Sequence, residues 1–138
     1  MLEIRGLNAG YGEVQILRDV TLSVGAVQIV TLVGGNGAGK STLLNSICGI
    51  FRPWSGSVQF DGTDITGLNS EAIVTRGITQ VPEGRRLFPQ MIVRENLLMG
   101  GFLRRDRAGI QRDLDWIYEL FPRLKERQVQ RAGSLSGD

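Results

Sequence analysis

Gly34-Gly35-Asn36-Gly37-Ala38-Gly39-Lys40-Ser41 is the stretch that decides the fold of this 138-residue chain. It fits the pattern G-x-x-x-x-G-K-[ST] of a phosphate-binding loop, or P-loop. Glycines let the backbone wrap around phosphate oxygens, so that successive N–H groups point at an anion. Lys40 is expected to reach the β- and γ-phosphates, Ser41 to bind Mg²⁺ through its hydroxyl, and Thr42 to add a hydroxyl contact. The motif therefore predicts a nucleotide site.

The residues on either side of the loop provide the context that the motif requires. Gln28–Val33 is almost continuously apolar and β-branched, which is typical of a strand buried on both faces. Residues 40–48 carry apolar side chains at helical spacing, and Gly49 is expected to end that helix. The alternative is a Gly-rich loop before an ordinary helix. A buried strand followed by the loop and a helix favours nucleotide binding instead.

The rest of the chain separates into a β-rich part and a helical part. Four further strands are predicted: alternating apolar residues indicate strands at 2–7 and 20–24, residues 57–62 a short strand that ends in a turn, and residues 77–81 a second buried strand that Pro82 ends. Helical spacing predicts helices at residues 93–102 and 110–121, the second ended by Pro122. We therefore expect a nucleotide-binding core over about 1–82 and a helical subdomain over about 83–138.

Composition excludes several classes of protein. The chain has one cysteine and no histidine, which excludes an internal disulfide and any His-dependent catalytic group or zinc site. No apolar run approaches the roughly 18–20 residues of a membrane span, and the N-terminus lacks the pattern of a signal peptide. Twelve of the sixteen basic residues lie between 76 and 131, interspersed with acidic ones, so we expect no nucleic-acid partner.

Six segments resemble the ATP-binding subunit of ABC transporters, and more narrowly the second ATPase subunit of branched-chain amino-acid importers. They are Gly34–Leu44, Asp61–Thr66, Val81–Pro89, Arg94–Gly100, Trp116–Leu124 and Arg131–Gly137. The resemblance implies an α/β fold: a P-loop NTPase core of the ABC ATPase type, incomplete as written, with antiparallel β elements and an Arg-rich helical subdomain. It implies ATP and Mg²⁺ as cofactors. Urea-type importers have closely similar subunits and stay open as an alternative.

The resemblance also assigns roles to individual residues. Tyr11 matches the aromatic residue that stacks on adenine, although an ordinary aromatic at a strand end would look the same. Glu83 stands where most of the family has a glutamine that contacts Mg²⁺ and the attacking water. Ser136 and Gly137 match the signature motif, which touches the γ-phosphate bound by the partner subunit. The phosphate-binding loop corresponds to Gly34, Gly35, Asn36, Gly37, Ala38, Gly39, Lys40, Ser41 and Thr42.

Partners and location follow from the same resemblance. Such subunits pair head to tail beneath a membrane permease, on the cytoplasmic face of the membrane. The helical segment is the part expected to meet the permease, with Arg85-Arg86-Leu87-Phe88 and the arginines at 104–107 as contact candidates. A solvated helical face is the competing interpretation of these arginines.

Three departures from the family pattern bear on mechanism. Ile92 replaces a helix-capping threonine, and Ala26-Val27-Gln28 replaces the usual Gly-Glu turn. The sequence ends at Asp138, where the signature has its second glycine, and it contains neither the Asp-Glu strand nor a switch histidine. We therefore expect no catalytic residue within the chain, and ATP binding without appreciable hydrolysis. A non-catalytic truncated product remains an alternative, whereas Leu135-Ser136-Gly137 disfavours a small-molecule kinase.

Overall fold

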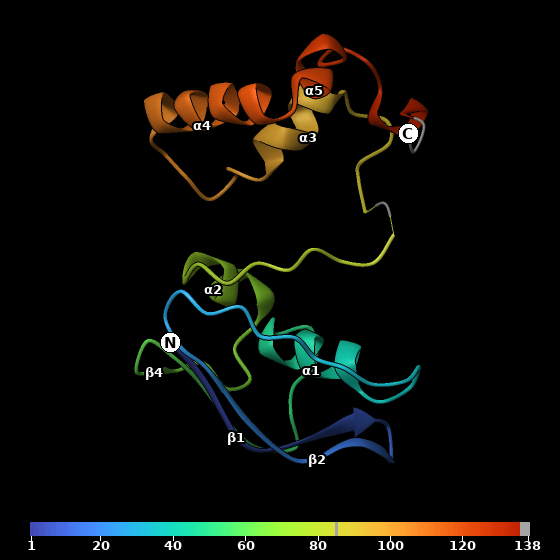
Figure 1. Ribbon diagram of the computed structural model, residues 1–138, viewed down its shortest axis with the longest axis vertical. Coiled ribbons are helices and arrows are strands. Elements are labelled where there is room, and N and C mark those ends of the chain that lie inside the picture. Colours follow the sequence, from blue (N-terminus) through green and yellow to red (C-terminus); the bar gives the residue numbers. More distant parts are fainter. Residues whose placement is uncertain (85, 136–138) are drawn as a thin grey trace. The chain divides into compact units, whose positions relative to one another are not determined.

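The computed structural model describes residues 1–84 and 86–135 (Figure 1). The chain forms two compact units, Met1–Val81 and Pro82–Asp138, which are described here one at a time.

The first unit contains a four-stranded antiparallel sheet in the order β2-β1-β3-β4. The strands are β1 Leu2–Tyr11, β2 Val14–Val24, β3 Ser55–Phe60 and β4 Thr63–Asp64. β1 and β2 form a hairpin whose register runs from Leu2 opposite Val24 to Tyr11 opposite Val14. Gly12 lies in the turn at a φ of 56°, a conformation that glycine adopts without strain. The predicted first two strands are therefore confirmed but longer than expected.

Helices α1 Lys40–Ile47 and α2 Ser70–Thr75 pack on this sheet (Figure 1). Asn69 begins α2, because its side-chain oxygen accepts a hydrogen bond from the Ala72 N–H at 2.9 Å. The shared core consists of nine buried side chains from both layers: Ile4, Leu7, Ala9, Leu17, Leu43, Ile47, Val58, Ile65 and Ile73. This core fixes α1, and with it the end of the P-loop, against the hairpin.

Two predicted strands are wrong. Neither 28–33 nor 77–81 is a strand in the structure. Ile29 is 98% exposed and Val33 92%, whereas Ile78 is partly buried and packs against the core. A strand needs a hydrogen-bonded neighbour, and the sheet of the described residues is completed by β1 to β4 alone. The β-branched composition of these segments favours the strand conformation, but a strand forms only where a neighbouring strand is available for pairing.

The second unit is helical. Its helices are α3 Val93–Met99, α4 Arg107–Leu120 and α5 Pro122–Glu126, followed by a 3₁₀ turn at Ala132–Ser134. The predicted helices at 93–102 and 110–121 are thus found with shifted ends, and Pro122 starts α5 rather than only ending α4. None of the helices in the described residues is both long and apolar enough to span a bilayer.

The start of α3 explains how the helix tolerates Ile92 at its N-cap. The Ile92 side chain offers no oxygen, and the Ile92 N–H instead donates to Glu95 Oε2 at 2.9 Å. The Val93 N–H donates to the carbonyl of Gln130 at 3.0 Å, and the Arg94 N–H to that of Gln128 at 2.9 Å. Carbonyls of the 128–130 segment therefore satisfy donors that a helix start leaves open.

Candidate nucleotide-binding site

Gly39, the last glycine of the P-loop, is required by the local geometry. Gly39 is the N-cap of α1 and has a φ of 88°, in the left-handed region. A Cβ at this position would lie 2.9 Å from Leu17 Cδ2 and 3.2 Å from Ile16 Cγ2, so a side chain would collide with β2. Positive φ and close approach to the hairpin both demand glycine here. The predicted helix start immediately after this residue is confirmed at Lys40.

Lys40 folds back over the loop that precedes it. Its Nζ donates to the carbonyl oxygen of Gly34 at 2.8 Å and to that of Gly35 at 2.7 Å. An ammonium group has three donors and is a strong phosphate ligand. The loop thus holds its positive charge at the glycines, where an incoming phosphate oxygen can replace a backbone carbonyl as its partner.

The loop and the first turn of α1 fit a polyphosphate. Gly39 offers no side-chain cap to α1, so the first N–H groups of this helix are open to an acceptor outside it. A Cβ built on Gly35 or Gly37 would meet nothing within 4 Å, which shows that the backbone of the loop borders open space. These features match the anion site that the motif predicts.

A magnesium ion would find its protein ligand in a hydroxyl group. Ser41 is exposed in the first turn of α1. Within the described residues, no cluster of three or more Asp, Glu, His or Cys side chains could hold a metal. Mg²⁺ at nucleotide sites is bound largely by phosphate oxygens and water, with one or two protein ligands. Ser41 fits that donor set.

Behind the loop, three side chains from different elements contact one another. Thr42 on α1 is only 5% exposed, and its Oγ1 lies 3.2 Å from the hydroxyl of Tyr11 at the end of β1. The Tyr11 ring meets Phe51 edge to face, with centroids 4.8 Å apart and planes at 86°. Tyr11 itself is 44% exposed, so part of its ring surface remains available. Below Thr42, Ser46 Oγ donates to the Thr42 carbonyl at 2.8 Å.

Phe51 is the residue of this cluster that sequence reasoning missed. It follows α1 in an irregular segment, and no motif includes it. Its role depends on the fold, which brings residue 51 to the end of a strand forty residues earlier.

The remaining predicted site residues are not brought to the loop by any described contact. Glu83 belongs to the second unit, where its side chain is exposed and its carbonyl accepts from Arg86 Nε at 3.4 Å. Ser136 and Gly137 lie outside the described residues. The roles of all three therefore remain predictions.

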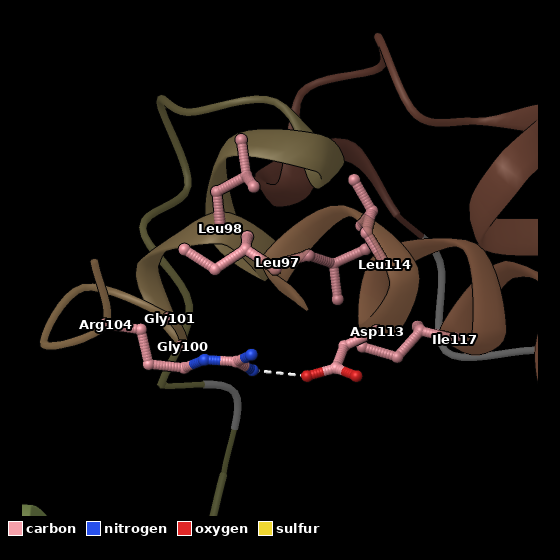
Figure 2. A pocket seen from close by; sticks show the side chains of 9 residues that line it. Leu97, Leu98, Gly100, Gly101, Arg104, Asp113, Leu114 and Ile117 are labelled. Carbon is pink, nitrogen blue, oxygen red and sulfur yellow. Dashed lines mark hydrogen bonds and ion pairs between the residues drawn. The ribbon is translucent and has the colours of Figure 1, made fainter. Parts of the chain in front are cut away.

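The second unit contains a separate pocket of about 250 Å³ between α3 and α4 (Figure 2). Its walls are mainly apolar, and Leu97, Leu98, Leu114 and Ile117 contribute to them. Arg104 and Asp113 form an ion pair at its border.

Arg104 is engaged inside this unit rather than free for a partner. Its Nε and Nη2 donate to the two carboxylate oxygens of Asp106, at 2.9 and 2.7 Å, and its Nη1 donates to Asp113. Hydrogen bonds from Arg104 lower the pKa of Asp106 below the usual range of an aspartate. Of the arginines predicted to contact a permease, Arg105 and Arg107 present exposed side chains, whereas Arg104 is held in this bidentate pair.

Comparison with known proteins identifies the family. The family model described as ABC transporter matches residues 17–137, and the fold is that of solved ABC ATP-binding cassettes. The chain therefore belongs to the ABC transporter family.

Individual relatives refine this assignment. The chain is 49% identical over 137 residues to the high-affinity branched-chain amino acid transport ATP-binding protein BraG of Pseudomonas aeruginosa, covering 99% of the chain and 58% of BraG. It is 30% identical over 153 residues to BraF, a high-affinity branched-chain amino acid transport ATP-binding protein of the same organism, covering 99% of the chain and 59% of BraF. A solved ABC transporter cassette in its ADP conformation gives a TM-score of 0.79 at 29% identity, over 99% of the chain and 59% of that cassette. The chain thus spans somewhat over half the length of these relatives.

Proposed function

We propose that Met1–Val81 binds ATP with Mg²⁺ through the loop from Gly34 to Thr42. The observation that carries the proposal is the geometry around Lys40, whose ammonium lies against the loop carbonyls at the start of an uncapped helix. Lys40, Ser41 and Thr42 would hold the phosphates and the metal, and Tyr11 the base. When bound, the nucleotide would supply the free energy that a transporter uses to change conformation.

The test is a titration of the purified chain with ATP in the presence of Mg²⁺, followed by calorimetry. Lys40→Ala removes a charge-assisted hydrogen bond worth about 1.5–3 kcal/mol, so Kd should rise about 10- to 150-fold. Arg18→Ala is the matched control, because it removes one positive charge from an exposed position on β2. Equal affinities for the unmodified chain and the Lys40→Ala variant would refute the proposal.

We infer that the parent transporter imports branched-chain amino acids. The support is that BraG, at 49% identity, and BraF, at 30%, are both named as branched-chain amino acid transport ATP-binding proteins. In this proposal the chain acts on the cytoplasmic face of the membrane, paired with a second ATPase subunit, and Pro82–Asp138 meets the permease.

Transport by intact cells tests the substrate. A chromosomal Lys40→Ala variant should lose uptake of labelled leucine, while Arg18→Ala should retain it. Loss of urea uptake with leucine uptake intact would instead support the related urea-importer assignment and refute this one.

We further propose that the chain alone hydrolyses ATP no faster than its Lys40→Ala variant. Among the described residues, those gathered at the loop offer an ammonium group and the hydroxyls of Tyr11, Ser41 and Thr42. Such groups hold phosphates, and they include neither a carboxylate nor an imidazole, the side chains that most often act as general bases. Phosphate release by the chain well above that of the Lys40→Ala variant would contradict this proposal.

A further inference from the structure

Tyr11 is fixed at two points by residues that come from outside its own strand. Its hydroxyl meets Thr42 Oγ1 on α1 at 3.2 Å, and its ring meets Phe51 edge to face at 4.8 Å. Tyr11 therefore spans the distance between the loop after α1 and the first turn of that helix. Because part of the ring is exposed, the contacts leave surface on which a flat group can lie.

These two contacts hold the Tyr11 ring in one orientation before a ligand binds. A tyrosine side chain has two main torsions, and a contact with a second ring together with one at the hydroxyl restricts both. A ligand that stacks on a ring already held in place loses less affinity to ordering than one that must first immobilise it.

A bound phosphate would determine which of the two hydroxyl groups, that of Tyr11 or that of Thr42, donates the hydrogen bond between them. The Thr42 hydroxyl has a single hydrogen to donate, together with oxygen lone pairs that accept. If that hydrogen goes to a phosphate oxygen, the Tyr11 O–H must be the donor to Thr42 Oγ1. Tyr11 then orients the Thr42 hydroxyl as well as presenting its ring.

We propose that Phe51 is a positioning residue that holds the Tyr11 ring for the base of the nucleotide, and that the Tyr11 hydroxyl orients Thr42 for the phosphates. This inference rests on the proposed nucleotide binding. It assigns two separable effects to one residue: the ring serves the base, and the hydroxyl serves the phosphate.

The test compares two probes, ATP and inorganic pyrophosphate, both with Mg²⁺ and measured by calorimetry. Phe51→Leu keeps an apolar side chain but removes the aromatic ring, so ATP affinity should fall about 2- to 10-fold while pyrophosphate affinity stays unchanged. Tyr11→Phe keeps the ring and removes the hydroxyl, so pyrophosphate should weaken by a factor of about 2 to 10 and ATP by at least as much, because the hydroxyl contact also restrains the ring. Phe60→Leu, a partly buried phenylalanine on β3 that packs on the core, is the control and should change neither.

A double variant separates positioning from a merely structural role. In a Tyr11→Ala background, Phe51→Leu should have no further effect on ATP affinity, because the ring it positions is gone. A Phe51→Leu effect that persists in this background, or that weakens pyrophosphate equally, would overturn the role of Phe51. A Tyr11→Phe variant that binds pyrophosphate normally would overturn the role of the hydroxyl. If the unmodified chain and Lys40→Ala bind both probes equally, the proposed function itself fails, and this inference fails with it.

Discussion

Val27→Gly should stabilise the chain, because it removes a strained backbone conformation without losing a contact. Val27 has a φ of 57°, in the left-handed region that is unfavourable for a β-branched residue. Its side chain is fully exposed, so no packing is lost on removal. The surrounding turn is closed by a hydrogen bond from the Gly25 N–H to Gln28 Oε1 at 2.6 Å, which a substitution at residue 27 leaves in place.

The magnitude follows from two opposing terms. A left-handed conformation costs an L-residue about 1–2 kcal/mol, and a glycine recovers that cost. Glycine also gains freedom in the unfolded chain, which offsets about 0.5–1 kcal/mol of the recovery. The net expectation is an increase of about 0.5–1 kcal/mol in the free energy of unfolding, or about 2–4 °C in Tm for a chain of this size.

Urea denaturation followed by circular dichroism provides the measurement, with two controls. Val27→Ala removes the β-branch but keeps the Cβ that makes the conformation unfavourable, so it should recover less than half of the gain. Val81→Gly makes the same change at an exposed valine whose φ lies outside the left-handed region, and it should destabilise by about 0.5 kcal/mol. The reasoning is refuted if Val27→Gly is neutral or destabilising, or if Val27→Ala stabilises equally.

Two further predictions concern the helical unit. Ile92→Thr should raise the free energy of unfolding by about 0.5–1 kcal/mol in urea denaturation. The threonine hydroxyl can accept a hydrogen bond from the Glu95 N–H and so complete the capping pair. An equal gain from Ile92→Val would show that capping is not the cause. Asp106→Asn keeps an oxygen for Arg104 but removes the charge. Because the folded pKa of Asp106 is lowered, its contribution is present above about pH 4 and is lost as the pH falls further. The stability difference between the unmodified chain and Asp106→Asn should therefore shrink on acidification, and a difference independent of pH would contradict this account.

Patterns that depend on local contacts were the ones that predicted structure correctly. The helix after the P-loop begins at Lys40 as expected, because Gly39 and the spacing of Leu43 and Ile47 specify it within a few residues. Helix α2 was not predicted, although Asn69 provides its N-cap. A helix of six residues is too short to show a clear apolar periodicity in the sequence.

The apolar residues that predict the helix at 110–121, which recur at helical spacing as Ile110, Leu114, Ile117 and Phe121, were only partly informative about burial. Leu114 is buried as its spacing suggests, but Phe121 at the end of this series is 57% exposed. Tyr118, outside the series, is buried instead. Periodicity fixes which residues share a face of a helix, whereas burial depends on what packs against that face.

The sequence predicted the loop residues of the candidate site, but not the contacts that residues distant in the sequence make around them. The loop residues follow from the chemistry of phosphate binding, while the contact of Tyr11 with Thr42 and Phe51 joins residues up to forty positions apart. No local rule encodes such a contact, because it exists only once the hairpin and α1 share a core.

The hairpin, rather than the segment before the loop, positions the phosphate-binding residues of this unit. Residues 28–33 are exposed and irregular, yet Gly39 sits tightly against Leu17 on β2, and Thr42 is bonded to Tyr11 at the end of β1. Both contacts act on the α1 side of the loop, where the helix start and Lys40 lie. The groups at the start of α1 can therefore keep their geometry although the strand predicted before the loop is not formed, so we expect the chain to bind nucleotide in the proposed titrations.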